Sequence, residues 1–565
     1  MSDIKKILLA LMPYWDPLIP PNGIAHLKRF LQDYGFQVKT VDVILQEPFQ
    51  QIYDSYFKLL KEWVPEDHQG NFYNIGHEVL ENHLMAHYNY TDEKKYLEAV
   101  KQLVYNTYYI HIQDNQVCAL NRLMTEFYET LEAYILRLAA EEKPEVLGLT
   151  AYRGTLPASL FALKIIKINY PHIKTVIGGG IFTDTHAIGT PNFDTLLEYS
   201  KDFLDKIIIG QGELLFLKYL QGELPPTQRV YTRADIKGDI LTFPHMKIPD
   251  FSDFDFSRYP YLTGAASVSC PYECSFCGTR IFWGEHRVKD PKQTVSEMVE
   301  LHKLYERQLF FMTDALLNPI VGELAGGFIK NSAPIYYDAY FRVDEATANI
   351  ENTLLWRRGG LYRVRLGTES GSQRVLDMMG KQITPAMIKA AVSSLALAGI
   401  KTTTYWVIGH PGETEEDFQA TLDLIEELKD DIYQSEPNPF IYHYSHQSNS
   451  SQWESHRKPL YPDDIQDIMV FKTWTLDIEP RREEVYSRLY RFTQHCKKLG
   501  IPNPYSLGDY QKAELRWKKL HHNAVPSIMD FLSRKKEYID EKKNVKLPVV
   551  AGAAREDRTS ISFEL

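Results

Sequence analysis

The sequence predicts an α/β protein in which two parallel-sheet parts are followed by a helical region. Short apolar strands alternate with helices over the first 221 residues, and the alternation returns between residues 259 and 445. Such alternation is typical of parallel sheets, because each helix carries the chain back to start the next strand. The length of 565 residues agrees, since it corresponds to roughly two to four domains.

A doubly wound sheet is expected within residues 1–221. Its strands are the apolar runs at 7–11, 38–43, 146–150, 175–177 and 207–210. A helix opens at Pro20–Gly23, another covers 157–168, and a helical insertion occupies about 45–142. In sheets of this type, ligands bind in loops at the carboxyl ends of the strands.

A linker rich in Pro and Asp is expected at 222–258, and a second parallel sheet at 259–445. Its expected strands lie at 265–269, 309–312, 335–340, 362–366, 402–407 and 441–444. Six strand–helix units make a partial barrel, whose active site lies at the carboxyl ends of the strands. Residues 446–547 predict a helical region that packs over the barrel mouth and shapes the substrate site, and 548–565 a flexible tail.

Charge, hydropathy and cysteine content argue against a nucleic-acid-binding, membrane-spanning or secreted protein. A net charge of −11 argues against nucleic acid as a partner. No apolar run approaches the roughly 20 residues that span a bilayer. The first residues lead straight into a strand without a signal-peptide pattern. With five cysteines and no disulfide framework, the chain is expected in the reducing cytoplasm.

Three cysteines, Cys270, Cys274 and Cys277, stand at C-x3-C-x2-C spacing after an apolar run. Such a loop can hold three thiolates around one iron–sulfur cube, which normally takes four. Three thiolates leave one iron open, and an open metal position suits a bound reactant. The alternatives are three unrelated buried thiols or a zinc knuckle. Zinc prefers four ligands in two pairs, however, and no second pair is present.

The cysteine spacing, with aromatic Phe276 before the third cysteine, resembles the radical S-adenosylmethionine (radical SAM) superfamily. In that superfamily the amino and carboxylate groups of SAM chelate the open iron of a [4Fe–4S] cluster. One electron from the cluster then cleaves SAM to methionine and a 5′-deoxyadenosyl radical. The resemblance therefore implies both cofactors, and a reductant such as flavodoxin or ferredoxin as a partner.

Three later stretches also match that superfamily, at 311–314, 367–372 and 409–414. By resemblance they imply SAM contacts from Thr313, Asp314, Glu369, Ser370 and Gly409. Other roles stay open from the residues alone, because Asp314 could cap a helix, Glu369 could form a structural ion pair and the glycines could simply turn the chain. The Gly-Gly-Glu form of the SAM motif is absent from the second barrel strand.

The order of parts resembles the cobalamin-binding class of radical SAM enzymes, in which a Rossmann-like cobalamin domain precedes the barrel. The matching pieces are 20–27, 210–213 and the triplet Gly178, Gly179 and Gly180. The resemblance implies cobalamin beside this triplet, although glycines after strands serve nucleotide-like ligands and plain tight turns alike. His186 sits in a D-x-H-x-x-G pattern that supplies a cobalt ligand in mutases. The pattern follows a late strand here, so we interpret His186 as a loop histidine.

The resemblance implies a cobalamin-dependent C-methyltransferase that acts on a peptide or another natural product. The alternative is a cobalamin-independent enzyme that modifies peptides, either by cyclisation or rearrangement or as an epimerase. In an epimerase Cys496, the cysteine outside the triad in the catalytic half, would return a hydrogen atom. An inert packing thiol is the other interpretation of Cys496. A non-catalytic peptide scaffold is a third reading, which the intact cysteine triad disfavours.

Overall fold

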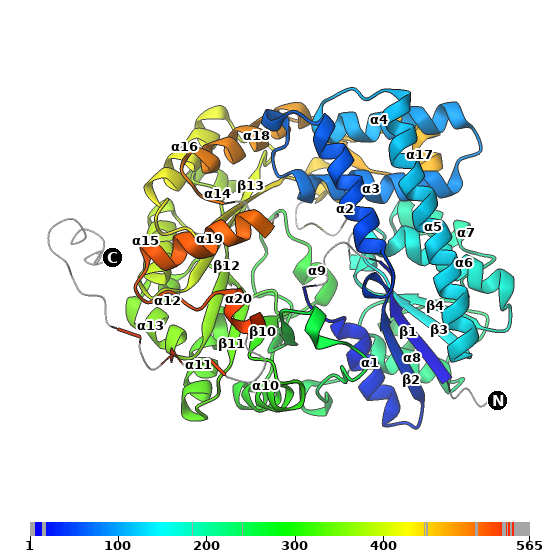
Figure 1. Ribbon diagram of the computed structural model, residues 1–565, viewed down its shortest axis with the longest axis horizontal. Coiled ribbons are helices and arrows are strands. Elements are labelled where there is room, and N and C mark those ends of the chain that lie inside the picture. The colour runs from blue at the N-terminus through cyan, green and yellow to red at the C-terminus, as the bar shows by residue number, and fades with distance from the viewer. Residues whose placement is uncertain are drawn as a thin grey trace. The chain divides into compact units, whose positions relative to one another are not determined.

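The computed structural model describes residues 6–13, 18–183, 185–239, 241–445, 447, 450–502, 507–533, 538–539, 541–542 and 545–546 (Figure 1). The chain forms two compact units. Unit 1 comprises Met1–Tyr259 and Tyr442–Leu476, and unit 2 comprises Pro260–Ile441 and Asp477–Leu565. No helix among the described residues combines the length and the hydropathy needed to cross a bilayer.

Unit 1 is built on a six-stranded parallel sheet with the strand order β2-β1-β3-β4-β5-β6. The strands are β1 (Lys6–Leu11), β2 (Gln37–Asp42), β3 (Val146–Thr150), β4 (Lys174–Gly178), β5 (Lys206–Ile208) and β6 (Val230–Tyr231). Helices α1 (Asn22–Gln32) and α8 (Gly212–Leu220) pack apolar side chains onto Ile7, Leu9 and Val176. This order confirms a doubly wound sheet, whose connections change direction between β1 and β3.

The insertion between β2 and β3 is helical. It contains α2 (Phe49–Trp63), α3 (Phe72–Asn89), α4 (Glu93–Tyr108) and α5 (Asp114–Glu142). Buried rings hold α2 on α5, with Phe49 edge-on to Phe127 and Tyr53 stacked on the same Phe127 ring. Aromatic pairs of this kind add to the free energy that burial of their area contributes.

Two segments that the sequence separates from the first sheet pack within unit 1. The expected linker, 222–258, contributes β6, and its Asp253 binds Lys28 at 2.8 Å and the Thr40 amide at 2.9 Å. Helix α17 (Asp463–Met469) packs against α3 and α4. The contacts therefore group residues 442–476 with unit 1, and the expected domain limits stay predictions.

Unit 2 contains a second six-stranded parallel sheet, whose order β14-β13-β12-β11-β10-β7 follows the sequence. The strands are β7 (Leu262–Gly264), β10 (Leu309–Met312), β11 (Tyr336–Arg342), β12 (Leu361–Glu369), β13 (Lys401–Ile408) and β14 (Gln434–Pro439). Helices α10 (Pro291–Tyr305), α11 (Val321–Lys330), α13 (Ile350–Arg358), α15 (Pro385–Leu397) and α16 (Glu415–Glu427) connect them. This sheet confirms the predicted six-unit partial barrel.

The first and last barrel strands differ from the prediction. The first is 262–264, and residues 267–268 instead form β8 (Ser267–Val268), which pairs antiparallel with β9 (Arg287–Val288). The last strand is 434–439 rather than 441–444. Its sequence, QSEPNP, is polar and contains two prolines. The strand lies at the edge of the sheet, where proline is tolerated because one side of the backbone needs no ladder partner.

The C-terminal helices close the amino ends of the barrel strands. Lys401, which begins β13, donates to Glu514 of α19 (Leu507–Leu520) at 2.8 Å. Tyr336, which begins β11, donates to Glu541 at 2.9 Å. Burial lowers the pKa of Lys401 to about 8, although Glu514 opposes that shift. This part of the expected 446–547 region therefore lies at the end of the barrel opposite the strands' carboxyl ends, and not over the mouth.

Candidate functional site

The cysteine loop of unit 2 lies between β8 and β9, beyond the carboxyl end of β7. Ser269 enters it with a positive φ of +72°, and its hydroxyl donates to the Gly284 carbonyl at 2.6 Å. The Cys277 amide donates to the Cys274 carbonyl at 3.0 Å and so forms a turn. Cys274 is buried, whereas Cys270 and Cys277 are partly exposed. The loop is thus a tight connection that carries the triad at the active-site end of the barrel.

The chemistry of these donors fits a [4Fe–4S] cube with one open iron. Each thiolate of a cube binds a different iron, so the three sulfur atoms need not converge on one point. The described residues contain no group of three His, Cys, Asp or Glu side chains placed to bind a single metal ion. Cys270, Cys274 and Cys277 are the residues that would hold the cube.

The cysteine loop is fixed by two other barrel elements. The Ser275 amide donates to the Met379 carbonyl at 2.9 Å, just after α14 (Gln373–Met378). The Ser275 hydroxyl lies 3.3 Å from Nε2 of His410, in the loop after β13. Burial lowers the pKa of His410 to about 4, so the ring is neutral at pH 7. The loop therefore depends on residues far away in the sequence for its shape.

Asp314 is buried and anchors the start of the cysteine loop. Its oxygens accept from the Ala266 amide at 3.1 Å and from the Ser267 hydroxyl at 2.6 Å. Burial raises the pKa of Asp314 to about 6, and these hydrogen bonds oppose the shift. Thr313 beside it is exposed, although its amide and hydroxyl both donate to the Gly264 carbonyl, at 2.8 and 3.2 Å. A SAM contact from either residue stays a prediction.

Glu369 ends β12 in a strained conformation and forms a buried ion pair. It has a φ of +63°, and the pairing of β12 with β13 shifts between Gly367 and Glu369. Its Oε1 lies 2.5 Å from Nζ of Lys381, which is itself 6.0 Å from the centre of the Phe276 ring. A Cβ on Gly367 would stand 2.5 Å from Oε1 of Glu369 and 2.9 Å from Nζ of Lys381, so a side chain there would displace the ion pair. Strain of this kind in a non-glycine residue is common at functional sites.

The remaining residue expected at the end of β12, Ser370, faces the protein interior. Its hydroxyl lies 3.3 Å from that of Thr421 on α16 and accepts from the Ser372 amide at 3.1 Å. These contacts fix the start of α14. A role of Ser370 in binding SAM likewise stays a prediction.

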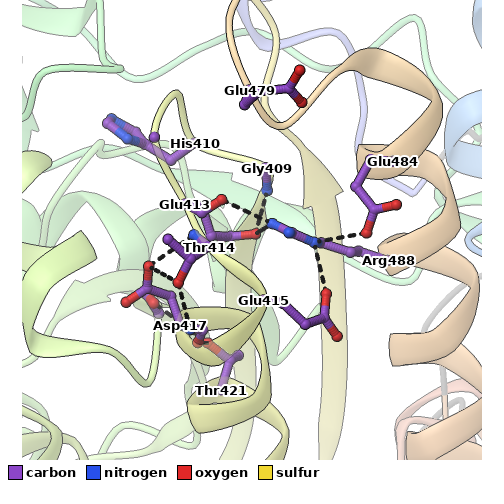
Figure 2. Close-up of polar contacts among 12 residues, drawn as sticks. Gly409, His410, Glu413, Thr414, Glu415, Asp417, Thr421, Glu479, Glu484 and Arg488 are labelled. Atoms are coloured by element: carbon purple, nitrogen blue, oxygen red, sulfur yellow. Dashed lines mark hydrogen bonds and ion pairs between the residues drawn. The ribbon is translucent and has the colours of Figure 1, made fainter.

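The loop after β13 is organised by a buried carboxylate, as Figure 2 shows. Oε1 of Glu413 accepts from the Gly409 amide at 3.1 Å and from Nη1 of Arg488 at 2.8 Å. Burial raises the pKa of Glu413 to about 7, and Arg488 opposes this shift. Gly409 has a φ of +78°, and a Cβ there would meet Val485 at 2.3 Å. Helix α18 (Arg482–Lys498) thus sets the conformation of this loop.

Cys496 lies on α18 and is not brought together with the cysteine loop. Burial raises the pKa of its thiol to about 12, and the side chain of Ser435 in β14 bonds to it. Ser435 is in register with Thr404, and alternation places both on the face opposite the Thr403 and Tyr405 side chains. The Tyr405 hydroxyl accepts from Nη1 of Arg365 at 3.2 Å on the inner face of the barrel. Ser435 is on the opposite face, so Cys496, which bonds to it, packs against the outer face.

In unit 1 the glycine triplet follows β4 and lies against the loop after β3. The Gly178 carbonyl accepts from the Ala151 amide at 2.8 Å. Gly179 has a φ of +107°, and a Cβ there would meet the Ala151 carbonyl oxygen at 2.6 Å. A Cβ on Gly180 would meet the Tyr152 ring at 2.9 Å. Close approach of two loops accounts for the triplet, and cobalamin contacts by these glycines stay a prediction.

The His186 ring is buried in unit 1, edge-on to Phe471 with ring centroids 4.4 Å apart. Asp184, the first residue of its D-x-H-x-x-G pattern, lies outside the described residues. The expectation that His186 is a loop histidine agrees with its place between η4 (Gly180–Thr183) and α7 (Pro191–Tyr199).

Sequence reasoning missed Arg342 and Lys381, buried cations that contact Cys274 and lie near the Phe276 ring. Arg342 ends β11, and its Nη1 donates to the Cys274 sulfur at 3.6 Å. A cation at the carboxyl end of a barrel strand is a signal that could have identified it. Lys381 follows α14 and carries no such local signal.

Comparison with known proteins agrees with this geometry. Residues 266–425 match the family model of the radical SAM superfamily. The anaerobic magnesium-protoporphyrin IX monomethyl ester cyclase of Rubrivivax gelatinosus is 26% identical over 318 residues, which cover 51% of this chain and 55% of that protein. An uncharacterised methyltransferase of Pyrococcus horikoshii is 24% identical over 321 residues, covering 53% of this chain and 68% of that protein. The chain thus spans about half the length of the cyclase that it matches.

The solved structures extend the likeness to both units. The radical SAM methyltransferase TsrM from Kitasatospora setae, solved with cobalamin and a [4Fe–4S] cluster, has a TM-score of 0.57 at 13% identity. The alignment covers 92% of this chain and 99% of that one. Residues 266–425 therefore form a radical SAM domain, and the chain as a whole has the fold of that methyltransferase.

Proposed function

We propose that this protein is a radical SAM enzyme whose cluster is held by Cys270, Cys274 and Cys277. The observation that carries the proposal is the position of the triad, on a tight loop at the carboxyl end of a six-stranded parallel barrel. When bound there, the [4Fe–4S] cluster and SAM supply a 5′-deoxyadenosyl radical that abstracts hydrogen from substrate. Activity of this kind needs an external one-electron reductant such as flavodoxin or ferredoxin.

The residues of the chain would hold SAM at the mouth of the barrel. Glu369 offers a buried carboxylate beside Phe276 and Lys381, and the Gly409 loop offers backbone groups held in place by Glu413. Thr313 is exposed at the end of β10. These groups come from three different strand ends around the cysteine loop, as expected of a cofactor that lies across a barrel mouth.

The reaction that we propose is cobalamin-dependent methylation of a carbon atom in a peptide or another natural product. Support comes from the fold, which is that of a methyltransferase solved with cobalamin and a [4Fe–4S] cluster. Further support comes from the glycine triplet at the carboxyl end of β4, the edge where doubly wound sheets bind ligands. No observation favours the epimerase alternative, since Cys496 packs on the outer face of the barrel.

The cluster assignment is tested by iron content and by SAM cleavage. Full-length protein reconstituted anaerobically should hold one four-iron cluster, and with dithionite it should release 5′-deoxyadenosine and methionine. The triple change of Cys270, Cys274 and Cys277 to Ala should abolish both. Cys118→Ala, an exposed cysteine in the insertion, is the matched control and should change neither. Retained SAM cleavage in the triple variant would refute the assignment.

The methyl-transfer assignment is tested separately. The protein should retain hydroxocobalamin after gel filtration, with its absorbance co-eluting in a one-to-one ratio. Product masses with SAM deuterated in its methyl group should rise by one CD₃ unit when candidate peptides are supplied. Protein that cleaves SAM but retains no corrinoid would exclude this reaction and leave the radical SAM assignment intact.

A further inference from the structure

Arg342 is a buried cation that contacts a thiol of the cysteine triad directly. It is the last residue of β11, and 6% of its surface is exposed. Its Nη1 donates to the Cys274 sulfur at 3.6 Å, within the range for a hydrogen bond to sulfur. Its guanidinium carbon lies 4.0 Å from the centre of the Tyr272 ring, two residues before that cysteine. Arg342 therefore contacts the cysteine loop at two of its residues, Tyr272 and Cys274.

The position of Arg342 is fixed by its own backbone. The Asn318 side chain accepts from the Arg342 amide at 2.9 Å and donates to the Arg342 carbonyl at 2.8 Å. The same Asn318 amide nitrogen donates to Asp344 at 2.6 Å. Both backbone groups are held, so the point on β11 from which the side chain reaches the thiol is fixed.

A second observation indicates that Arg342 faces a ligand. Its Nη2 is buried and has no hydrogen-bond partner in the structure described here. A charged donor that is buried without an acceptor is destabilising, more so than a neutral one, because it loses its hydration and gains no partner. Nη2 belongs to the same planar guanidinium as the Nη1 that donates to the Cys274 sulfur. An anionic acceptor bound at the cysteine loop would remove this cost.

We propose that Arg342 tunes the reduction potential of the cluster, by donating to the Cys274 thiolate through Nη1 and to an anionic acceptor of the bound cluster through Nη2. This inference rests on the proposed function, because it requires a cluster at the triad. Arg342 would act on the cluster both through Cys274 and through its own Nη2. Reduction adds one negative charge to the cluster, and a buried cation stabilises that charge because screening by solvent is weak there. Hydrogen bonds to cluster sulfur have the same effect.

Redox titration of the reconstituted full-length protein tests this role. The midpoint potential is measured without SAM, by adding dithionite and following the electron paramagnetic signal of the reduced cluster. Arg342→Met should raise the equilibrium ratio of oxidised to reduced cluster at least tenfold. For a one-electron couple this is a fall in the midpoint potential of 59 mV. Arg342→Lys keeps the positive charge but loses the forked donors of the guanidinium. The midpoint potential of this variant should lie between those of the wild type and Arg342→Met.

The matched control is Arg280→Met in the same loop. Arg280 carries the same charge, but it is exposed, pairs with Glu273 at 3.0 Å and donates to the Pro271 carbonyl at 3.0 Å. Salt screens an exposed charge, so this change should move the potential much less. A fall in Arg280→Met as large as that in Arg342→Met would attribute the effect to net charge alone and overturn the proposal.

The remaining outcomes are also decisive. Equal potentials in the wild type and in Arg342→Met, with full iron content in both, would overturn the proposal and leave the proposed function standing. If Arg342→Met holds no iron, Arg342→Gln is measured in its place. Two folded variants without iron would make Arg342 a requirement for assembly of the cluster and would overturn its role as a tuning residue. A wild-type protein without a cluster would instead refute the proposed function.

Discussion

Single residues around the cysteine loop show how burial decides between a structural and a chemical role. Asp314 and Glu369 are both buried carboxylates at strand ends. Asp314 accepts from an amide and a hydroxyl of the loop, whereas Glu369 meets a buried ammonium group, Lys381. The first arrangement anchors backbone, and the second holds a charge pair next to the ring of Phe276. Two carboxylates that look alike in the sequence therefore differ in role: Asp314 anchors the backbone, and Glu369 forms an ion pair.

Asp314→Asn should change the pH dependence of stability. Burial raises the pKa of Asp314 from 3.8 to about 6, so the folded protein binds the proton more tightly than the unfolded chain. The associated stability is fully present below pH 3.8 and is lost as the pH rises through about 6. A shift of this size corresponds to about 3 kcal/mol. The difference between wild-type and variant unfolding free energies should therefore change between pH 4 and 6.

The measurement is urea unfolding of both proteins at pH values from 4 to 7. Asp290→Asn is a suitable control, because Asp290 is an exposed helix cap at α10. A difference curve for Asp314→Asn that is flat over this range would show that Asp314 is ionised normally in the folded protein.

Cys496→Ala should leave turnover within about twofold of wild type. The thiol is buried against β14 on the outer barrel face, so its loss creates only a small cavity, at a cost of about 1 kcal/mol. SAM cleavage and iron content should be unchanged, and the melting temperature should fall slightly. Solvent deuterium entering a substrate residue in the wild type, and its absence in Cys496→Ala, would make Cys496 a hydrogen donor and favour the epimerase alternative.

At the scale of elements, α18 holds the loop after β13 through one buried ion pair (Figure 2). Glu413 and Arg488 are almost fully buried, whereas the neighbouring pair Arg491–Glu415 is exposed. Removing one partner of a buried pair leaves an uncompensated charge, which costs about 3–5 kcal/mol. An exposed pair contributes about 0–1 kcal/mol. Burial, and not the number of charges, therefore decides which pair matters.

Arg488→Met should destabilise the protein strongly and weaken SAM binding, because the Gly409 amide shares the acceptor that Arg488 holds. Arg491→Met is the matched control and should have little effect on either. Urea unfolding and equilibrium dialysis with SAM provide the two measurements. In the double variant Glu413→Gln/Arg488→Met, part of the stability should return, since no charge is left buried. Equal losses in Arg488→Met and Arg491→Met would contradict this account.

The sequence predicted those elements whose cause is local. The cysteine triad and the apolar strands of both sheets could be found because spacing and hydrophobic runs are properties of neighbouring residues. Strand β14 could not, since its polar, proline-containing sequence forms a strand only through pairing with β13. Lys381 could not, because it carries no local signal and only the fold brings it beside Phe276. Arg342 had a local signal, its place at the end of a barrel strand, but its contact with Cys274 spans 68 positions of the chain. The positions of α19 and of Glu541 at the amino ends of the strands depend on such distant partners too.

At the scale of the whole molecule, unit 1 is completed by a segment from late in the chain. Ile465 and Met469 are buried on α17, which packs against α3 and α4. The Asn192 side chain donates to the Lys472 carbonyl at 2.9 Å and accepts from the Lys472 amide at 2.8 Å. Burial of an apolar side chain of the size of Ile465 or Met469 stabilises a protein by about 1.5–3 kcal/mol. The first 259 residues alone therefore leave apolar surface of α3 and α4 uncovered.

A fragment that ends at residue 259 should be less stable than the same fragment with 442–476 attached through a flexible linker. The added segment restores the contacts of α17 and of Lys472. Thermal unfolding and limited proteolysis of the two fragments compare them directly. A version with Ile465→Asp and Met469→Asp in the attached segment is the control and should behave like the short fragment. Equal melting temperatures for all three would show that 442–476 adds nothing to unit 1.

The discontinuity of unit 1 also has a consequence for the order of events on the ribosome. The chain passes from one unit to the other three times, after residues 259, 441 and 476. Because synthesis runs from the amino terminus, the α3–α4 surface is made several hundred residues before the helix that covers it. Unit 1 therefore remains incomplete until residues 442–476 have been translated, after most of the barrel. A nascent chain with exposed apolar helices is the kind of species that chaperones bind. Production of this protein should consequently depend on translation speed between residues 260 and 476 more than on speed elsewhere.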